Sequence, residues 1–417
     1  MKSSYWISIT ALLVLGLSRC ATPSNDPNLL ETLMNSKQAQ FLPYLNDTNK
    51  LQIQIIYTQI NRDENNFPSF KSYYYNVDST KYFYPASTVK LPLVLLSLEK
   101  LHTLNIDGLD KNSPMLSDSV YSGQRSVSND TTSQNGFPSV GHYAKKILVV
   151  SDNDAYNRLY ELMGQKETNQ ILNNKGYNIR ILHRLERALT PDQNRHTEAI
   201  RFLSGEKVIY NQPLLINRDS IQPPRREFFG FGYMQGDSLI RDAFDFTYKN
   251  SYPLQEQQEI LKAILFPQAV DEKKRFNISE TDRQFVLQYI SQLPRETEFP
   301  RYYQDTTYYD AYCKFLMFGE DKESIQSNIR IFNKVGDAYG FLIDNAYIID
   351  FDRGIEFMLS AVINTNTDQI YNDGVYEYKT LGYPLMKSLG QLIYNHELTR
   401  KRPNKPDLSE FKLTYDR

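Results

Sequence analysis

Residues 84–92 read Tyr-Pro-Ala-Ser-Thr-Val-Lys-Leu-Pro, and a mostly apolar run follows them from Leu93 to Leu101. A segment that is apolar on nearly every side is typical of a helix buried inside a domain rather than one lying on its surface. The stretch therefore predicts a central helix whose polar residues stand only at its start.

Ser87 and Lys90 form a candidate nucleophile and base at that start. They are three residues apart, so a helix beginning at Ser87 places them on one face, one turn apart. A serine hydroxyl needs a base to take its proton, and a lysine desolvated against apolar helices has its pKa lowered enough to act as one.

The Ser-x-x-Lys pattern is weak by itself, because it also occurs at Ser97, Ser204 and Ser409. Only Ser87 opens a predicted buried helix. The alternative interpretation of Ser87 and Lys90 is a helix-capping serine with a surface lysine.

Composition limits the classes of function. A chain of 417 residues with 41% hydrophobic residues suits about two to three domains, or one large domain with insertions. With 47 basic and 49 acidic residues it has no electrostatic footprint for nucleic acid. The histidines show no paired metal-ligand spacing, so we expect no metal and no cofactor; they are His102, His142, His183, His196 and His396.

The first twenty residues predict export. Lys2 precedes an apolar run from Ile7 to Leu17, which is typical of a signal peptide at residues 1–20. Cys20 resembles the acylated cysteine of bacterial lipoproteins, although Arg19 stands where those signals have a small residue. The alternatives are ordinary cleavage nearby or a retained anchor. With Cys20 lipidated, only Cys313 remains and no internal disulfide is possible.

Periodicity predicts helices and strands at both ends of the chain. Near the N-terminus we expect a helix over 28–42, which ends at Pro43, and strands over 51–57 and 69–77. Near the C-terminus we expect a strand over 329–337, a hairpin of 346–351 with 355–363, and a helix over 383–397. Further helices are expected over 142–150, 254–266 and 280–293. The two ends together predict one α+β domain into which the middle of the chain is inserted.

Two further motifs stand at element boundaries. Ser151-Asp152-Asn153 falls between two predicted helices, where such a triplet alone is typical of a helix cap. Lys334-Val335-Gly336 falls at the end of a predicted strand.

Ser-x-x-Lys, Ser-Asp-Asn and Lys-x-Gly in this order resemble the penicillin-recognising serine hydrolases, class A β-lactamases in particular, over most of residues 28–400. The resemblance implies a five-stranded antiparallel sheet flanked by helices, plus an inserted all-helical subdomain. We assign the α/β part to 21–82 and 325–417, and the mostly helical part to 83–324. The latter includes an insertion at about 205–253, rich in proline, arginine and aromatic residues.

The resemblance also implies roles. Ser87 would be the nucleophile, Lys90 its base or proton relay, and Ser151 a proton shuttle to the leaving nitrogen. The backbone N–H groups of Ser87 and Asp337 would form the oxyanion hole. Substrate binding would fall to Asn153, Lys334 and Gly336.

Glu186 is the candidate base for the deacylating water, because Arg184-Leu185-Glu186 falls near the family's Ω-loop motif. The alternative is an ordinary surface residue, with the water activated elsewhere, for example by Lys90. Thr190 replaces an expected asparagine, and Val335 replaces a hydroxyl residue that would help to bind a substrate carboxylate. Val335 and the negative Asp337 weaken the case for ordinary penicillinase activity.

These features predict an exported, lipid-anchored and monomeric serine hydrolase at the periplasmic or outer-membrane face of the cell envelope. It would act through an acyl-enzyme on a β-lactam or related amide. The alternatives are a peptidoglycan D-amino-acid peptidase or esterase, and a catalytically inactive binding lipoprotein that keeps the cleft. The predicted ligand is a small-molecule amide or a peptidoglycan-derived substrate; no nucleic-acid partner is expected.

Overall fold

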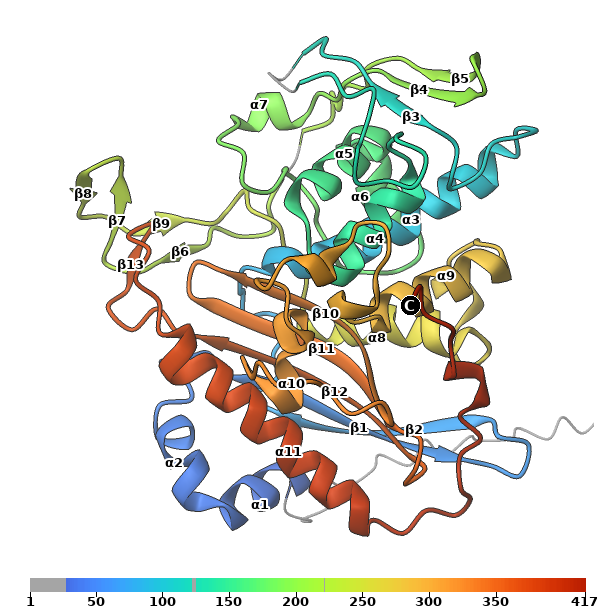
Figure 1. Ribbon diagram of the computed structural model, residues 1–417. Coiled ribbons are helices and arrows are strands. Elements are labelled where there is room, and N and C mark those ends of the chain that lie inside the picture. The colour runs from blue at the N-terminus through green and yellow to red at the C-terminus, as the bar shows by residue number, and fades with distance from the viewer. Residues whose placement is uncertain (1–27, 122–124, 221) are drawn as a thin grey trace, which may run out of the picture.

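The computed structural model describes residues 28–121, 125–220 and 222–417. The predicted signal peptide and Cys20 lie outside the described residues. At the centre is a five-stranded sheet in the order β10-β11-β12-β1-β2 with antiparallel neighbours throughout (Figure 1). The strands are β1 (Gln54–Arg62), β2 (Pro68–Tyr75), β10 (Ile329–Ala338), β11 (Phe341–Asp350) and β12 (Ile355–Asn364). The predicted α+β class with a five-stranded antiparallel sheet is confirmed.

The sheet is covered on both faces. β11 and β12 are buried at every position, as expected for strands between two layers. One face packs against α1 (Leu29–Ser36), α2 (Gln38–Asn46) and α11 (Tyr383–Thr399); the other faces α8 (Leu254–Leu265), α9 (Glu280–Ser291) and the helical part of the chain (Figure 1).

The predicted helix over 28–42 differs from the structure. The chain forms two helices that meet at Lys37, and the second continues through Pro43 to Asn46. Proline removes one helical hydrogen bond. Phe41 and Tyr44 are both buried beneath the sheet, and their burial offsets that loss.

The apolar run after Ser87 forms the central helix of the helical part of the chain. α3 (Lys90–Leu104) is buried along almost its whole length. It packs against α4 (Val140–Val150) and α5 (Asn153–Met163), and α6 (Gln165–Asn174) follows. A 3₁₀ turn, η1 (Ala86–Val89), precedes α3, so Ser87 lies in this turn rather than in the helix proper.

The inserted part is not all-helical, because it also contains short strands. β3 (Met115–Ser117), β4 (Ile200–Ser204) and β5 (Lys207–Gln212) form a three-stranded sheet, β6 (Phe228–Phe229) pairs with β9 (Phe244–Asp245), and β7 (Gly232–Gln235) lies between β8 (Ser238–Ile240) and β13 (Ile370–Tyr371). Two one-turn helices are α7 (Pro191–Asn194) and α10 (Phe315–Phe318). No helix in the described part of the chain is long and apolar enough to cross a membrane.

Candidate active site

Ser87 is held in its turn by the edge strand β10. Ala86 has φ +48°, a left-handed conformation that L residues rarely adopt. A Cβ atom added to Gly336 would lie 2.8 Å from the Pro85 carbonyl oxygen and 2.9 Å from the Ser87 nitrogen. The glycine of Lys-x-Gly is therefore needed so that β10 can approach the Ser87 backbone this closely.

Lys90 lies one turn beyond Ser87 and is fully buried. Its Nζ donates to Asn153 Oδ1 at 2.6 Å, to Ser151 Oγ at 3.2 Å and to the Ser151 carbonyl oxygen. Burial lowers the pKa of Lys90 well below its usual range, and the nearby Lys334 ammonium lowers it further. A lysine in this state favours the neutral amine, the form that accepts a proton.

Lys334 approaches Ser151 from β10. Its Nζ donates to Ser151 Oγ at 2.8 Å and to the Val335 carbonyl oxygen at 3.0 Å. Burial lowers the pKa of Lys334 to about 8. The Ser151 hydroxyl thus lies between two amine groups, and the three motifs meet in space.

Ser151 ends α4, and its left-handed backbone, φ +61°, turns the chain into α5. The capping role in the Ser-Asp-Asn triplet belongs to Asp152, whose carboxylate accepts from the Ala155 N–H at 2.7 Å. Ser151 and Asn153 are therefore free to face Lys90.

The two remaining candidate residues, Asp337 and Glu186, are both acidic. Burial against the site raises the pKa of the Asp337 carboxyl, Lys90 and Lys334 oppose that rise, and Glu186 adds to it. Glu186 is exposed and has φ +50°. The charge of Glu186 thus influences Asp337, the residue that follows Lys-x-Gly on β10.

The loop over residues 182–190, here the Glu186 loop, is fixed by buried polar contacts that the sequence analysis did not identify. Arg184 donates to the two carboxylate oxygens of Glu161 at 2.6 and 2.8 Å, and neither side chain is exposed. Asn157 donates to the Leu185 carbonyl oxygen at 3.0 Å and accepts from the Leu185 N–H at 2.9 Å. Both anchors come from α5, which starts at the Ser-Asp-Asn motif.

The expectation for Val335 is wrong. Side chains alternate between the two faces of a strand, and Val335 is 2% exposed within the hydrophobic cluster that α11 closes. Its side chain therefore does not line the site, and a hydroxyl at this position would be buried.

Thr190 does not stand where it could hold a water for Glu186. It caps α7: its Oγ1 accepts from the Gln193 N–H at 3.2 Å, and its own N–H donates to Gln193 Oε1 at 2.8 Å. The replacement of an asparagine by Thr190 therefore has a structural role at the start of α7. Among the residues described, no three His, Cys, Asp or Glu side chains come together as a metal site would require.

Comparison with known proteins finds one family that matches part of the chain. Residues 36–215 match the family model described as "Beta-lactamase enzyme family", a span that contains Ser87, Lys90, the Ser-Asp-Asn motif and Glu186. No curated protein sequence matches the chain. This match bears out the resemblance to class A β-lactamase-like proteins over residues 36–215.

Several solved structures are similar to this chain. A β-lactamase from Xanthomonas campestris pv. campestris is 11% identical over 87% of this chain and 98% of its own, with a TM-score of 0.45. A β-lactamase from Burkholderia phymatum is 12% identical over 88% and 100%, also with a TM-score of 0.45. A structure of PBP-A is 14% identical over 88% and 95%, with a TM-score of 0.46.

Proposed function

We propose that the protein is a serine hydrolase that acts through an acyl-enzyme on a β-lactam or a related amide. The observation that supports this best is the position of the Ser151 hydroxyl between the Lys90 and Lys334 amines, at 3.2 and 2.8 Å, with Ser87 one turn before Lys90. The match to the β-lactamase enzyme family over residues 36–215 supports the coarser class of serine hydrolase, and this geometry supports the reaction.

Acylation follows from these contacts. Neutral Lys90 takes the proton of Ser87 Oγ, and the oxygen attacks the carbonyl carbon of the amide. The backbone N–H groups of Ser87 and Asp337 stabilise the negative charge on the carbonyl oxygen. As the C–N bond breaks, Ser151 gives its proton to the leaving nitrogen and regains one from Lys90. Substrate is held by Asn153, Lys334 and the backbone at Gly336.

Deacylation requires a base for water. Glu186 takes a proton from a water that attacks the acyl carbon, the bond to Ser87 Oγ breaks, and the serine recovers its proton. The contacts of Arg184 and Asn157 fix the backbone beside Glu186, so the carboxylate starts from a defined place.

A peptidase or esterase activity is the second candidate, and Asp337 favours it. Asp337 follows Lys-x-Gly on β10 and interacts electrostatically with Lys90, Lys334 and Glu186. The two carboxyls therefore oppose a small substrate that carries its own carboxylate beside the scissile bond. Substrates that are neutral at that point avoid this repulsion. An inactive binding protein is the least supported of the three, since it has no need for a desolvated Lys90.

Export, lipidation at Cys20, a cell-envelope location and a monomeric state are part of the same proposal. A peptidoglycan-derived or other small amide substrate fits an exported enzyme of this class.

Intact-mass measurement after incubation with a penicillin and, separately, with a fluorophosphonate tests the proposal. We expect one adduct per chain, lost in Ser87→Ala and kept in Ser97→Ala. Ser97 is the matched control because it is also in a Ser-x-x-Lys pattern, but its buried hydroxyl donates to the Leu93 carbonyl at 2.8 Å. Labelling that persists in Ser87→Ala would refute the assignment of Ser87 as the nucleophile. An adduct with the fluorophosphonate alone would support the esterase.

A further inference from the structure

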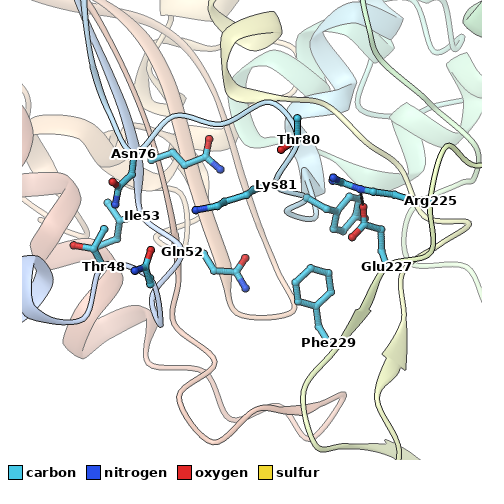
Figure 2. Close-up of a pocket in the computed structure, with 12 residues that line it drawn as sticks. Thr48, Gln52, Ile53, Asn76, Thr80, Lys81, Arg225, Glu227 and Phe229 are labelled. Carbon is cyan, nitrogen blue, oxygen red and sulfur yellow. Dashed lines mark hydrogen bonds and ion pairs between the residues drawn. The ribbon is translucent and has the colours of Figure 1, made fainter.

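A cavity of about 510 Å³ lies apart from Ser87, between the start of β1 and the inserted segment. Figure 2 shows Lys81 extending between Asn76 and Gln52, with Arg225 and Phe229 facing them from the other side. None of Ser87, Lys90, Ser151, Glu186 and Lys334 lines this cavity. Whatever it binds does not have to reach the nucleophile.

A second cavity of about 210 Å³ continues the first. The two share Asn49, Gln52 and Phe229 in their walls, and the second extends to Asn366 and Tyr371. We call the two together the amide groove. Two adjoining cavities suit a chain of linked units better than a single small molecule.

Many side chains that line the groove are amides, and most of these amides make no hydrogen bond to another described residue. Four of these side chains make no hydrogen bond to any other described residue: Asn49, Gln52, Asn76 and Gln369. Lys81 makes no ion pair with a described residue. Asn366 is 6% exposed, yet neither its oxygen nor its nitrogen has a partner in ordinary geometry among the described residues, the nearby Tyr371 hydroxyl included. A buried amide of this kind is available to an occupant that both donates and accepts a hydrogen bond.

The backbone of the groove is also unusual. Gln52 has φ +47° and Gln369 has φ +60°, a conformation that costs of order 1 kcal/mol or more for a residue other than glycine. Such outliers are concentrated at ligand sites. Here the strained residues carry two of the unoccupied amides.

We propose that the amide groove binds an acidic, N-acetylated oligosaccharide. An acetamido group offers one N–H donor and one C=O acceptor, which match the free side-chain amides. The half-buried ring of Phe229 offers an apolar face for a sugar ring. Lys81 supplies a cation for a carboxylate, whereas Arg225 is already paired with Glu227. The polar walls disfavour an apolar ligand.

Isothermal titration with three peptide-free probes tests the proposal: neutral tetra-N-acetylchitotetraose, tetragalacturonate, which is acidic without amides, and an oligosaccharide of alternating N-acetylglucosamine and N-acetylmuramic acid. We expect the third to bind at least about tenfold more tightly than either of the others. Saturable binding of none of them, or equal binding of all three, would overturn the assignment.

Variants locate the site. Phe229→Ala and Gln52→Gly should each weaken binding by about tenfold or more, and Lys81→Gln should abolish the preference for the acidic probe over the chitotetraose. Phe231→Ala is the matched control, because Phe231 is 72% exposed in the same segment and lines neither cavity. Lys37→Gln is the control for Lys81.

The test distinguishes a loss of binding from a loss of folding. Gln52→Gly relaxes a left-handed backbone, so its melting temperature should not fall even as binding is lost. Fluorophosphonate labelling of Ser87 should be unchanged in all these variants, which separates the groove from the proposed hydrolase. Binding that survives both Gln52→Gly and Lys81→Gln, or that occurs only with a peptide added as a fourth probe, would refute the proposal.

Discussion

Lys90 and Lys334 meet at one hydroxyl and have different surroundings. Both are buried, but Lys90 is also close to Lys334, which disfavours a second positive charge. Two ammonium groups this near each other, with few counter-charges, do not both stay protonated at neutral pH. In the proposed mechanism the two lysines therefore have different roles: Lys90 acts as the neutral base, and Lys334 remains the cation.

This division predicts a bell-shaped pH dependence of kcat/KM for a carboxylate-bearing substrate. The rate rises as Lys90 loses its proton and falls above about pH 8, where Lys334, with a pKa of about 8, becomes neutral. Lys334→Arg should move the alkaline limb upward, since arginine stays charged. An alkaline limb that stays at pH 8 in Lys334→Arg would assign it to another group.

In the proposed mechanism, release of the acyl group depends on Glu186. We expect Glu186→Gln to leave acylation of Ser87 largely intact while the adduct accumulates, because only the second half-reaction loses its base. Stopped-flow burst kinetics and intact mass measure the two steps. Turnover as fast as in the parent would make Glu186 a surface residue and leave Lys90 as the base for the water. A parent that never releases the acyl group would behave as a penicillin-binding protein.

At the scale of elements, α5 and α6 each hold one loop backbone with an asparagine. Asn157 on α5 brackets Leu185, and Asn169 on α6 brackets Ile181 in the same manner, donating to its carbonyl oxygen at 2.7 Å and accepting from its N–H at 2.9 Å. Only Leu185 adjoins Glu186. The two asparagines are therefore a natural pair for comparison.

Asn157→Ala and Asn169→Ala should each cost about 1–3 kcal/mol in urea unfolding, because two buried backbone groups lose their partners. Only Asn157→Ala should also lengthen the lifetime of the acyl-enzyme, by about tenfold, since it releases the residue before Glu186. Equal lifetimes in the two variants would mean that the loop backbone does not position the carboxylate.

The elements differ in how far the sequence predicts them. The apolar run of α3 and the long strands of the sheet are set by local periodicity, and each strand was predicted near its place. Their ends were less well predicted: β1 covers Gln54–Arg62 rather than 51–57, and β11 begins at Phe341 rather than at residue 346. The capping box of Thr190 was also readable, because Thr-x-x-Gln is its usual signature. The two-residue strands β6 and β9 were not, since two residues show no period.

The candidate site shows the same contrast. Ser87, Lys90, Ser151 and Lys334 were predicted as a set because each motif is local and their order is informative. The partner of Arg184 could not be predicted from spacing, because Glu161 is brought to it by the packing of α5. Similarly, the direction of Val335 depends on which face of β10 meets the helices.

At the scale of the whole molecule, the insertion is built into the site rather than appended to it. Phe246 is fully buried and contacts aromatic rings from distant parts of the chain. Its ring centroid lies 6.0 Å from that of Tyr84, 5.3 Å from Tyr339 and 5.2 Å from Tyr371. Tyr84 precedes the Ser87 turn and Tyr339 follows Asp337, so one side chain of the insertion touches both walls of the site.

Phe246→Ala should therefore disturb stability and chemistry together. Removing a fully buried phenylalanine costs about 3–5 kcal/mol of unfolding free energy, and the cavity would lie directly behind Tyr84 and Tyr339. We expect a slower fluorophosphonate acylation of Ser87, measured at a temperature where the variant is still folded by circular dichroism. Phe231→Ala is the control; because Phe231 is exposed, it should change stability by less than about 0.5 kcal/mol and leave acylation unchanged. If Phe246→Ala lost stability but acylated Ser87 at the parental rate, the insertion would support the fold without positioning the nucleophile, and the Ser87 turn would be held by β10 and Gly336 alone.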